Sequence, residues 1–251
     1  MNSLQANFLN ETHKLFMKSK VVACFVVAVI IPVIMAFLIA LLHDKAGVLA
    51  VDPAGFPVFI LGGFTAILLP LFIFMWTADS FAGEVGDNNL KIVLVRPISR
   101  FKIYLSKIMS LGLSAIILLL IILLSTFSAG FFLGGNISSH LSGLGNGIIT
   151  YTAAVVPMLS LVIFAAFIAQ FFKSSSGALT TSIFVYIAAR LLPVVFPTSS
   201  KVLLFSYTNW HEMWLGNLAS PEKLIYAFLI MFSSCIIFYA LGFYLFDNKE
   251  L

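Results

Sequence analysis

The residues best placed to do chemistry in this sequence stand in one polar segment, Asp79–Lys107, between two long apolar runs. This segment holds eight of the 24 charged side chains of the chain. Within it, Leu90–Val95 is apolar except for Lys91, and Pro97 ends the run. An apolar stretch outside the membrane needs a cover. The pattern therefore predicts a docking element for a soluble partner, with plain positive-inside anchoring as the alternative.

The sequence offers little to other kinds of chemistry. It has no Gly-x-x-x-x-Gly-Lys-[Ser/Thr] motif for holding nucleotide phosphates. No two of its four histidines stand four residues apart, and no cysteine joins them at the spacing of metal ligands. We therefore expect a chain that is not an enzyme and that has no metal site or cofactor of its own.

The composition places the chain in a membrane. Hydrophobic residues make up 61% of it and charged residues 10%, against about 25% charged in ordinary soluble domains. The mean hydropathy is +1.09. A soluble fold of this size could not cover itself with so little polar surface, so soluble enzymes and nucleic-acid-binding domains are excluded.

Six apolar runs are long enough to cross about 30 Å of hydrocarbon as helices. They do not alternate in polarity as the strands of a membrane β-barrel would. We therefore predict an all-α integral membrane protein with one transmembrane domain over residues 1–251. The predicted spans are 21–42, 58–78, 108–133, 151–172, 177–196 and 224–246.

The basic residues predict the orientation of the spans. Ten of them fall on the side of the membrane that holds both termini, three fall on the other side, and Arg190 lies within a span. By the positive-inside rule, both termini are cytoplasmic. We expect a multi-pass protein of the bacterial cell (inner) membrane.

The first twenty residues predict an amphipathic helix that precedes the first span as an elbow. At 100° per residue, Leu4, Phe8, Leu9, Thr12, Leu15 and Phe16 share one arc. Asn7, Asn10, Glu11, His13, Lys14 and Lys18 share the opposite arc. We expect the helix to lie in the inner interface, with its polar face toward anionic headgroups.

Residues 79–107 predict a helix, a sharp turn and a second helix that continues into the third span. Ser99 can cap that second helix by accepting from the backbone N–H at position 101 or 102. Ile98 and Ile103 have the spacing of a hydrophobic staple across the cap. The first helix, over residues 90–95, would be the element that contacts the partner.

Two segments on the outer side differ in character. Residues 193–221 are rich in aromatic side chains, which favours short interfacial or re-entrant helices. Residues 134–150 carry five glycines and no formal charge, which predicts a flexible hairpin.

Arg190 is the only ionisable residue well inside a predicted span. Its insertion at the centre of a bilayer costs about 2.5–3.5 kcal/mol. Two interpretations stand: the side chain reaches the outer interface, or it lines a polar cavity as a gate or substrate contact, with Glu212 or Asp52 as partner.

The segment between the second and third spans resembles the signature of ABC-2-type transporter permeases. That signature has a Glu, a short turn, a Leu-rich stretch, Pro-x-Ser-Arg and a Lys before the third span. Asn88-Asn89-Leu90 departs from the Gly-Thr-Leu that is usual there. The residues that match are Glu84, Leu90, Leu94, Arg96, Pro97, Ser99, Arg100 and Lys107.

The resemblance implies the membrane half of an ATP-binding-cassette exporter. A separate ATPase subunit would bind the 90–95 helix or the turn after it, and would use the ATP and Mg. A second permease, identical or related, would complete the complex. The cargo implied is amphiphilic: an antimicrobial peptide, a drug or a lipid-like molecule.

The sequence is also compatible with other functions. Sodium efflux by an ABC permease would need oxygen-rich sites, and the spans offer only scattered Ser and Thr. An ATP-independent transporter usually carries acidic residues at mid-membrane, and these spans have none. An immunity protein that sequesters a toxin without ATP is a further alternative.

Overall fold

The computed structural model describes residues 3–46, 52–86, 98–134, 137–197, 203–215 and 220–249. Over these residues the chain is helical and contains no strand. Residues 87–97 lie outside the described part. The predicted coupling helix at 90–95 falls there, and so do four of the residues in the family signature: Leu90, Leu94, Arg96 and Pro97.

Six helices in the described part are long and apolar enough to cross a membrane, as the sequence predicts. They run over Ser19–Leu42, Phe56–Gly86, Arg100–Leu133, Gly143–Ala169, Ser175–Val195 and Pro221–Asp247. The long elements are α1 (Ser3–Phe16), α2 (Ser19–Ala46), α3 (Phe56–Gly63), α4 (Leu69–Gly86), α6 (Arg100–Gly130), α7 (Ile137–Ala169), α8 (Ser175–Val195) and α9 (Pro221–Asp247). The short ones are a π-helix, η1 (Phe64–Leu68), and three 3-10 helices, η2 (Phe131–Leu133), η4 (Leu204–Tyr207) and η5 (Trp210–Trp214).

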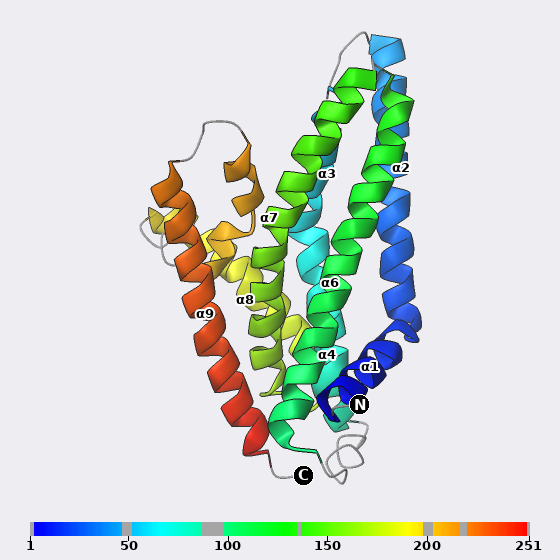
Figure 1. Ribbon diagram of the computed structural model, residues 1–251. Helices are drawn as coiled ribbons and strands as arrows, with labels where there is room; N and C mark the ends of the chain where they lie inside the picture. Colours follow the sequence, from blue (N-terminus) through cyan, green and yellow to red (C-terminus); the bar gives the residue numbers. More distant parts are fainter. Residues whose placement is uncertain are drawn as a thin grey trace.

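The helices form a bundle in which α7 is the most enclosed. Its apolar window is 61% buried, whereas that of α9 is 11% buried. Helix α7 packs against α4, α6, α8 and α9. Both termini lie at the same end of the bundle (Figure 1). We call this the basal end; it comprises α1, the last turns of α4 and α9, the first two turns of α6, and the first turns of α2 and α8.

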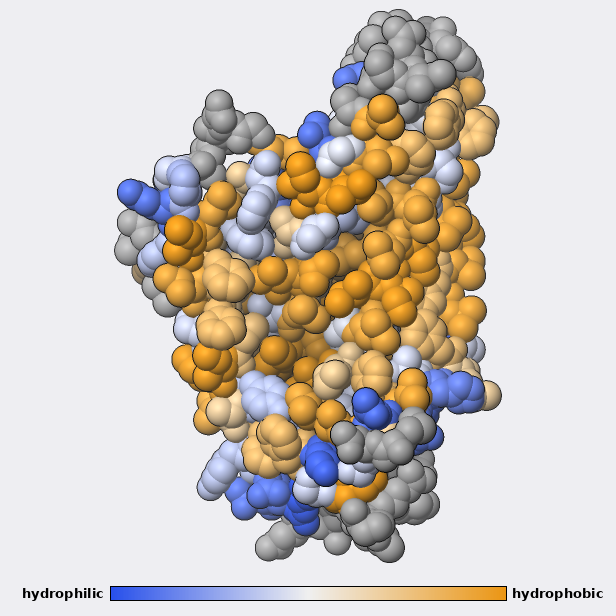
Figure 2. Space-filling view, in the orientation of Figure 1, coloured by the Kyte–Doolittle hydropathy of each residue, from blue (hydrophilic) through white to orange (hydrophobic). Residues whose placement is uncertain are grey.

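The surface of the bundle suits a bilayer. Figure 2 shows, on the face that it draws, a broad hydrophobic band across the middle, with most of the hydrophilic residues toward the two ends. Large apolar side chains are exposed along α2, α8 and α9, including Phe37, Phe184 and Phe232. Burial of these side chains requires lipid or another protein, because nothing in the described chain covers them.

The helices extend beyond the predicted spans. Helix α4 continues to Gly86, and α6 already begins at Arg100, so most of the predicted 79–107 loop is helix. Helix α7 begins at Ile137, so the prediction of a flexible hairpin over residues 134–150 was wrong. Glycine weakens a helix, but packing against neighbouring helices outweighs that preference in a membrane bundle.

The aromatic outer segment forms the two short helices η4 and η5. Helix η5 packs mainly on α7, and η4 contacts α7, α8 and α9. Phe205, Tyr207 and Trp210 are buried there, whereas Phe196 and Trp214 are exposed. Most of these rings therefore pack within the bundle rather than forming a surface belt.

Two glycines of α4 allow the turn between α7 and α8 to approach closely. A Cβ at Gly83 would lie 2.5 Å from Ser175 Oγ, and one at Gly86 would lie 2.6 Å from the carbonyl oxygen of Lys173. Both distances are shorter than real Cβ contacts. The end of α4 can therefore pack this closely on the start of α8 only because these two positions have no side chain.

We predict that Gly86→Ala lowers the stability of the protein by about 1–3 kcal/mol, because the added methyl group overlaps a backbone atom. Gly63→Ala is the matched control, since a Cβ there meets nothing within 4 Å. Thermal unfolding of both purified variants in detergent tests this. Equal unfolding temperatures would contradict the close contact.

Candidate functional site

Two residues of the signature that resembles ABC-2-type permeases, Glu84 and Lys107, meet at the basal end. Glu84 lies in the last turn of α4, just before the segment that is not described. Lys107 lies two turns into α6, just after it. Both side chains are buried, with exposed fractions of 5% for Glu84 and 0% for Lys107. The two ends of the predicted coupling segment are thus joined inside the protein.

Lys107 is held by two carboxylates. Its Nζ donates to Glu84 Oε2 at 2.7 Å and to Glu11 Oε2 at 2.8 Å. It also donates to the carbonyl oxygen of Ser80 at 3.3 Å and lies 5.9 Å from the centroid of the Phe81 ring. An ammonium group has three protons to donate, and each has an acceptor here.

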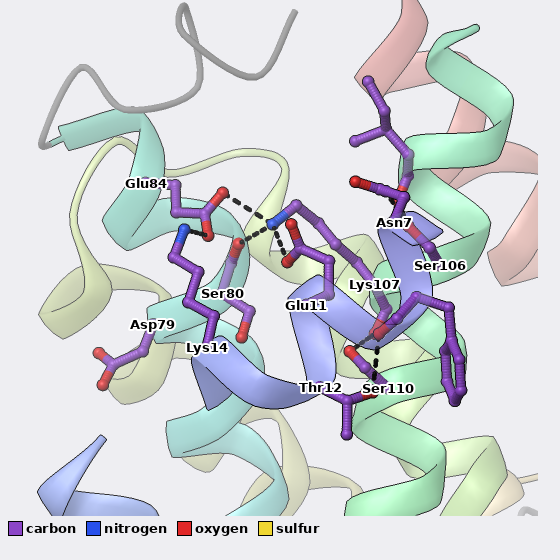
Figure 3. Close-up of polar contacts among 12 residues, drawn as sticks. Asn7, Glu11, Thr12, Lys14, Asp79, Ser80, Glu84, Ser106, Lys107 and Ser110 are labelled. Carbon is purple, nitrogen blue, oxygen red and sulfur yellow. Dashed lines mark hydrogen bonds and ion pairs between the residues drawn. The ribbon is translucent and has the colours of Figure 1, made fainter. Parts of the chain in front are cut away.

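A second lysine completes the group. Lys14 Nζ forms an ion pair with the other oxygen of Glu84. Glu11, Lys14, Glu84 and Lys107 therefore make a neutral set of two acids and two bases, which we call the basal ion cluster. Figure 3 shows these side chains converging from α1, α4 and α6.

The cluster explains how a lysine can be fully buried. Moving an isolated ammonium group out of water is very costly, and a buried pair recovers that cost only with good geometry and further hydrogen bonds. Here the ammonium nitrogen lies 2.7 Å from one carboxylate oxygen and 2.8 Å from the other. Removal of one partner would leave an uncompensated charge, which costs about 3–5 kcal/mol.

The cluster corrects the predicted placement of the N-terminal helix. The sequence assigns the polar face of residues 4–19 to lipid headgroups. Instead, Asn7 and Glu11 are buried against α6, where Asn7 donates to Ser106 Oγ. Leu9, assigned to the apolar face, is 55% exposed. The reason is that Lys107 and Glu84 offer this helix partners that a polar surface pattern does not reveal.

A second group of charges lies beside the cluster. Asp79 Oδ2 accepts from Lys20 Nζ at 3.0 Å, and the carbonyl oxygen of Asp79 accepts from Lys18 Nζ at 3.3 Å. Figure 3 shows the Asp79 carboxylate pointing away from Lys107. Burial lowers the pKa of Lys18, while the nearby Asp79 carboxylate acts in the opposite direction.

The other signature residues in the described part lie at the start of α6. Ser99 is the N-cap residue of α6, as predicted, but its hydroxyl makes no capping hydrogen bond. Arg100 donates through Nη1 to the carbonyl oxygens of Asp247 and Lys249. The guanidinium group supplies donors to carbonyls at the end of α9, and its positive charge interacts favourably with the negative end of the α9 helix dipole.

Three members of this site were missed from the sequence: Asn7, Glu11 and Lys14. A signal existed, because Glu11 is an acidic residue among basic ones on a face assigned to anionic headgroups. An acidic residue on that face is better explained by an ion pair with a cation of the protein than by contact with lipid. The cation that it pairs with, Lys107, lies 96 residues further along the chain. No local sequence pattern predicts a contact between residues that far apart.

Arg190 lies far from the cluster. It stands fifteen residues beyond the start of α8, so about 22 Å along that helix. Its Nε donates to Tyr186 Oη at 3.2 Å, and its guanidinium carbon lies 5.7 Å from the centroid of that ring. Within the described residues, it forms no ion pair with the expected partners Glu212 or Asp52.

The Arg190–Tyr186 pair reaches an irregular point in the second span. Tyr186 Oη donates to the carbonyl oxygen of Ala66 at 2.8 Å. In a regular α-helix, that carbonyl would pair with the N–H of residue 70, and Pro70 has none. The π-helix η1 lies at the same place. Tyr186 therefore ties α8 to the π-helical part of the second span.

The ion cluster has no arrangement suited to metal chemistry. In the described ranges, no three His, Cys, Asp or Glu side chains lie close enough together to hold a metal ion. Both acids of the cluster are already engaged by lysines. What the arrangement can do is hold helices together: it joins α1 to the last turn of α4 and to the first two turns of α6.

Comparison with known proteins identifies a family. The family described as "Protein of unknown function (DUF2705)" matches residues 55–251. The chain belongs to the DUF2705 family. The match includes Glu84, Lys107 and Arg190, whereas α1 with Glu11 and Lys14 precedes it.

One curated relative is similar over most of the chain. The "Uncharacterized protein YhcI" of Bacillus subtilis (strain 168) is 24% identical over 204 residues. The aligned part covers 74% of this DUF2705 chain and 65% of the relative. The chain thus spans just under two thirds of that protein's length.

We predict that Lys107→Met lowers the stability of this DUF2705 protein by about 3–5 kcal/mol, because two buried carboxylates lose their shared cation. The matched control is Lys20→Met, whose ion pair with Asp79 is 58% exposed on the lysine side and should cost less than about 1 kcal/mol. The apparent unfolding temperature in detergent measures both. Similar temperatures for the two variants would argue against the cluster.

We predict that Tyr186→Phe destabilises the protein by about 1 kcal/mol, since the Ala66 carbonyl loses a donor. Tyr244→Phe provides the control, because Tyr244 is 65% exposed. Unfolding temperatures of the two variants should differ, with Tyr186→Phe the lower. A Tyr186→Phe protein as stable as wild type would show that the hydrogen bond contributes little.

Proposed function

We propose that this chain is the membrane-spanning subunit of an ATP-binding-cassette exporter, driven by a separate ATPase subunit that binds the segment between α4 and α6. The proposal rests on the permease-like signature over residues 84–107 and on the six spans. It also needs a path from that segment to the spans.

The observation that carries the proposal is the basal ion cluster. Glu84 and Lys107 stand at the two ends of the signature segment, and the two side chains pair at 2.7 Å. Because Glu11 and Lys14 join them, α1 is part of the same unit. A force on the segment would therefore move α4, α6 and α1 together rather than bending a loose loop.

The signature residues divide into two roles under this proposal. Leu90 and Leu94 would contact the ATPase, with Arg96 and Pro97 shaping the turn. Glu84 and Lys107 are buried, so they would position the segment rather than touch the partner. Arg100 would add α9 to the moving unit through the carbonyl of Asp247.

The working complex would pair this chain with a second permease, a copy or a relative, and with two ATPase subunits that use ATP and Mg. The basal end would face the cytoplasm of a bacterial cell, in keeping with ten basic residues on that side against three on the other. The cargo would be amphiphilic, since the spans carry no pattern of charges for a polar solute.

The docking claim predicts the effect of Leu94→Asp. The wild-type protein, tagged in its native cell and extracted in mild detergent, should copurify with an ATPase subunit and with ATP hydrolysis. Leu94→Asp should reduce that recovery at least about tenfold, as expected for an apolar anchor in an interface. Leu141→Asp, a matched change at a residue that is 68% exposed on α7, should leave recovery unchanged.

The experiment also separates the alternatives. A sodium-efflux permease would copurify with the ATPase but show ATP-dependent sodium transport in vesicles. An ATP-independent transporter or immunity protein would bring down no ATPase. Copurification that Leu94→Asp leaves intact would show that the partner binds elsewhere and would reject the docking claim.

A further inference from the structure

A lateral groove opens between α2 and α8 at the basal end, with α4 as its floor. It consists of two adjoining cavities of about 420 and 410 Å³, which share Lys20, Met75 and Leu179. These volumes fall in the range of pockets that bind small molecules. We call the two cavities together the basal groove.

The deeper part of the groove is apolar. Its walls include Cys24 and Val27 of α2, Leu71 and Phe72 of α4, and Leu179 and Ile183 of α8. From Lys20 to Val27 the wall rises by about 10 Å, roughly two thirds of one hydrocarbon leaflet. Beyond Lys20 at the mouth, the only polar group on these walls is the weakly donating thiol of Cys24, so an extended peptide would leave most of its backbone unsatisfied there.

The mouth of the groove is polar. It is lined by Lys20 and Asp79, which pair at 3.0 Å, and by Ser175 and Ser176 at the start of α8. Lys18 also reaches Asp79, through its carbonyl oxygen. Two ammonium groups thus stand against one carboxylate, and the first turn of α8 holds no acidic residue. The mouth therefore favours an anion.

The packing of α4 on α8 holds the mouth in place. Ser175 lies against Gly83, and Lys173 lies against Gly86, so the start of α8 is pressed onto the end of α4. The Ser174 hydroxyl caps α8 by accepting from the N–H of Gly177 at 3.3 Å. The serine hydroxyls of the mouth consequently stand on a fixed helix end rather than on a free loop.

We infer that the basal groove binds an anionic phospholipid from the leaflet at the basal end. One acyl chain would lie between α2 and α8, and the phosphate would accept hydrogen bonds from Lys20 and from the Ser175 or Ser176 hydroxyl. The charge of the mouth and the apolar depth of the groove together match this amphiphile. Binding needs neither ATP nor an ATPase, so it stands or fails separately from the proposed exporter role.

The inference can be tested by native mass spectrometry of the purified protein with phosphatidylglycerol and with phosphatidylcholine of the same acyl chains. Wild type should bind phosphatidylglycerol more tightly. Lys20→Gln should weaken phosphatidylglycerol binding about fivefold, as for one basic residue near an anionic surface, and weaken phosphatidylcholine binding less, because the choline cation offsets the phosphate charge. Leu179→Trp should fill the groove and weaken the binding of both lipids.

Two matched variants control for general effects. Lys223→Gln removes an exposed lysine at the other end of the bundle, and Leu229→Trp adds a ring on the exposed face of α9. Neither should alter lipid binding. Equal binding of both lipids by wild type would overturn the inference, as would equal losses in the controls. A dimer that Leu179→Trp dissociates without affecting lipid binding would assign the groove to a second copy and reject the lipid.

Discussion

A fully buried ammonium group between two carboxylates is the constraint on which the basal end of this protein depends. Lys107 cannot lie there alone, so Glu11 and Glu84 must both be present, and each comes from a different helix. The requirement brings α1 under the bundle and fixes the end of α4 against the start of α6. The amphipathic helix α1, which the sequence places at a membrane surface, instead buries one face against the bundle.

The rest of the bundle is held by weaker and less specific contacts. Helices α2, α8 and α9 expose most of the residues of their apolar windows. The second span, by contrast, also has two buried polar contacts with other helices. Glu84 of α4 joins the ion cluster, and the carbonyl of Ala66, within the π-helix η1, accepts from Tyr186 of α8.

This arrangement gives the proposed coupling a physical form. A docking segment can transmit force only if its ends are rigidly attached, and Glu84 and Lys107 supply that attachment by pairing across the segment. The basal groove lies beside the cluster, and α4 contributes its floor and the mouth residue Asp79. Lipid binding and coupling would thus act on one helix, although each can be measured without the other.

The number and order of the spans, and the start of a helix after Ser99, could be predicted from the sequence, because hydropathy and capping act over a few neighbouring residues. Glu84 and Lys107 could also be singled out from the sequence, because both match the signature that resembles ABC-2-type permeases. Their pairing with Glu11 and Lys14 could not. Neither could the burial of Asn7, nor the link from Tyr186 to the carbonyl freed by Pro70. Local patterns determine where helices form, whereas only the packing of helices far apart in the chain decides which charges meet, because a buried charge must find whichever partner the fold brings within reach.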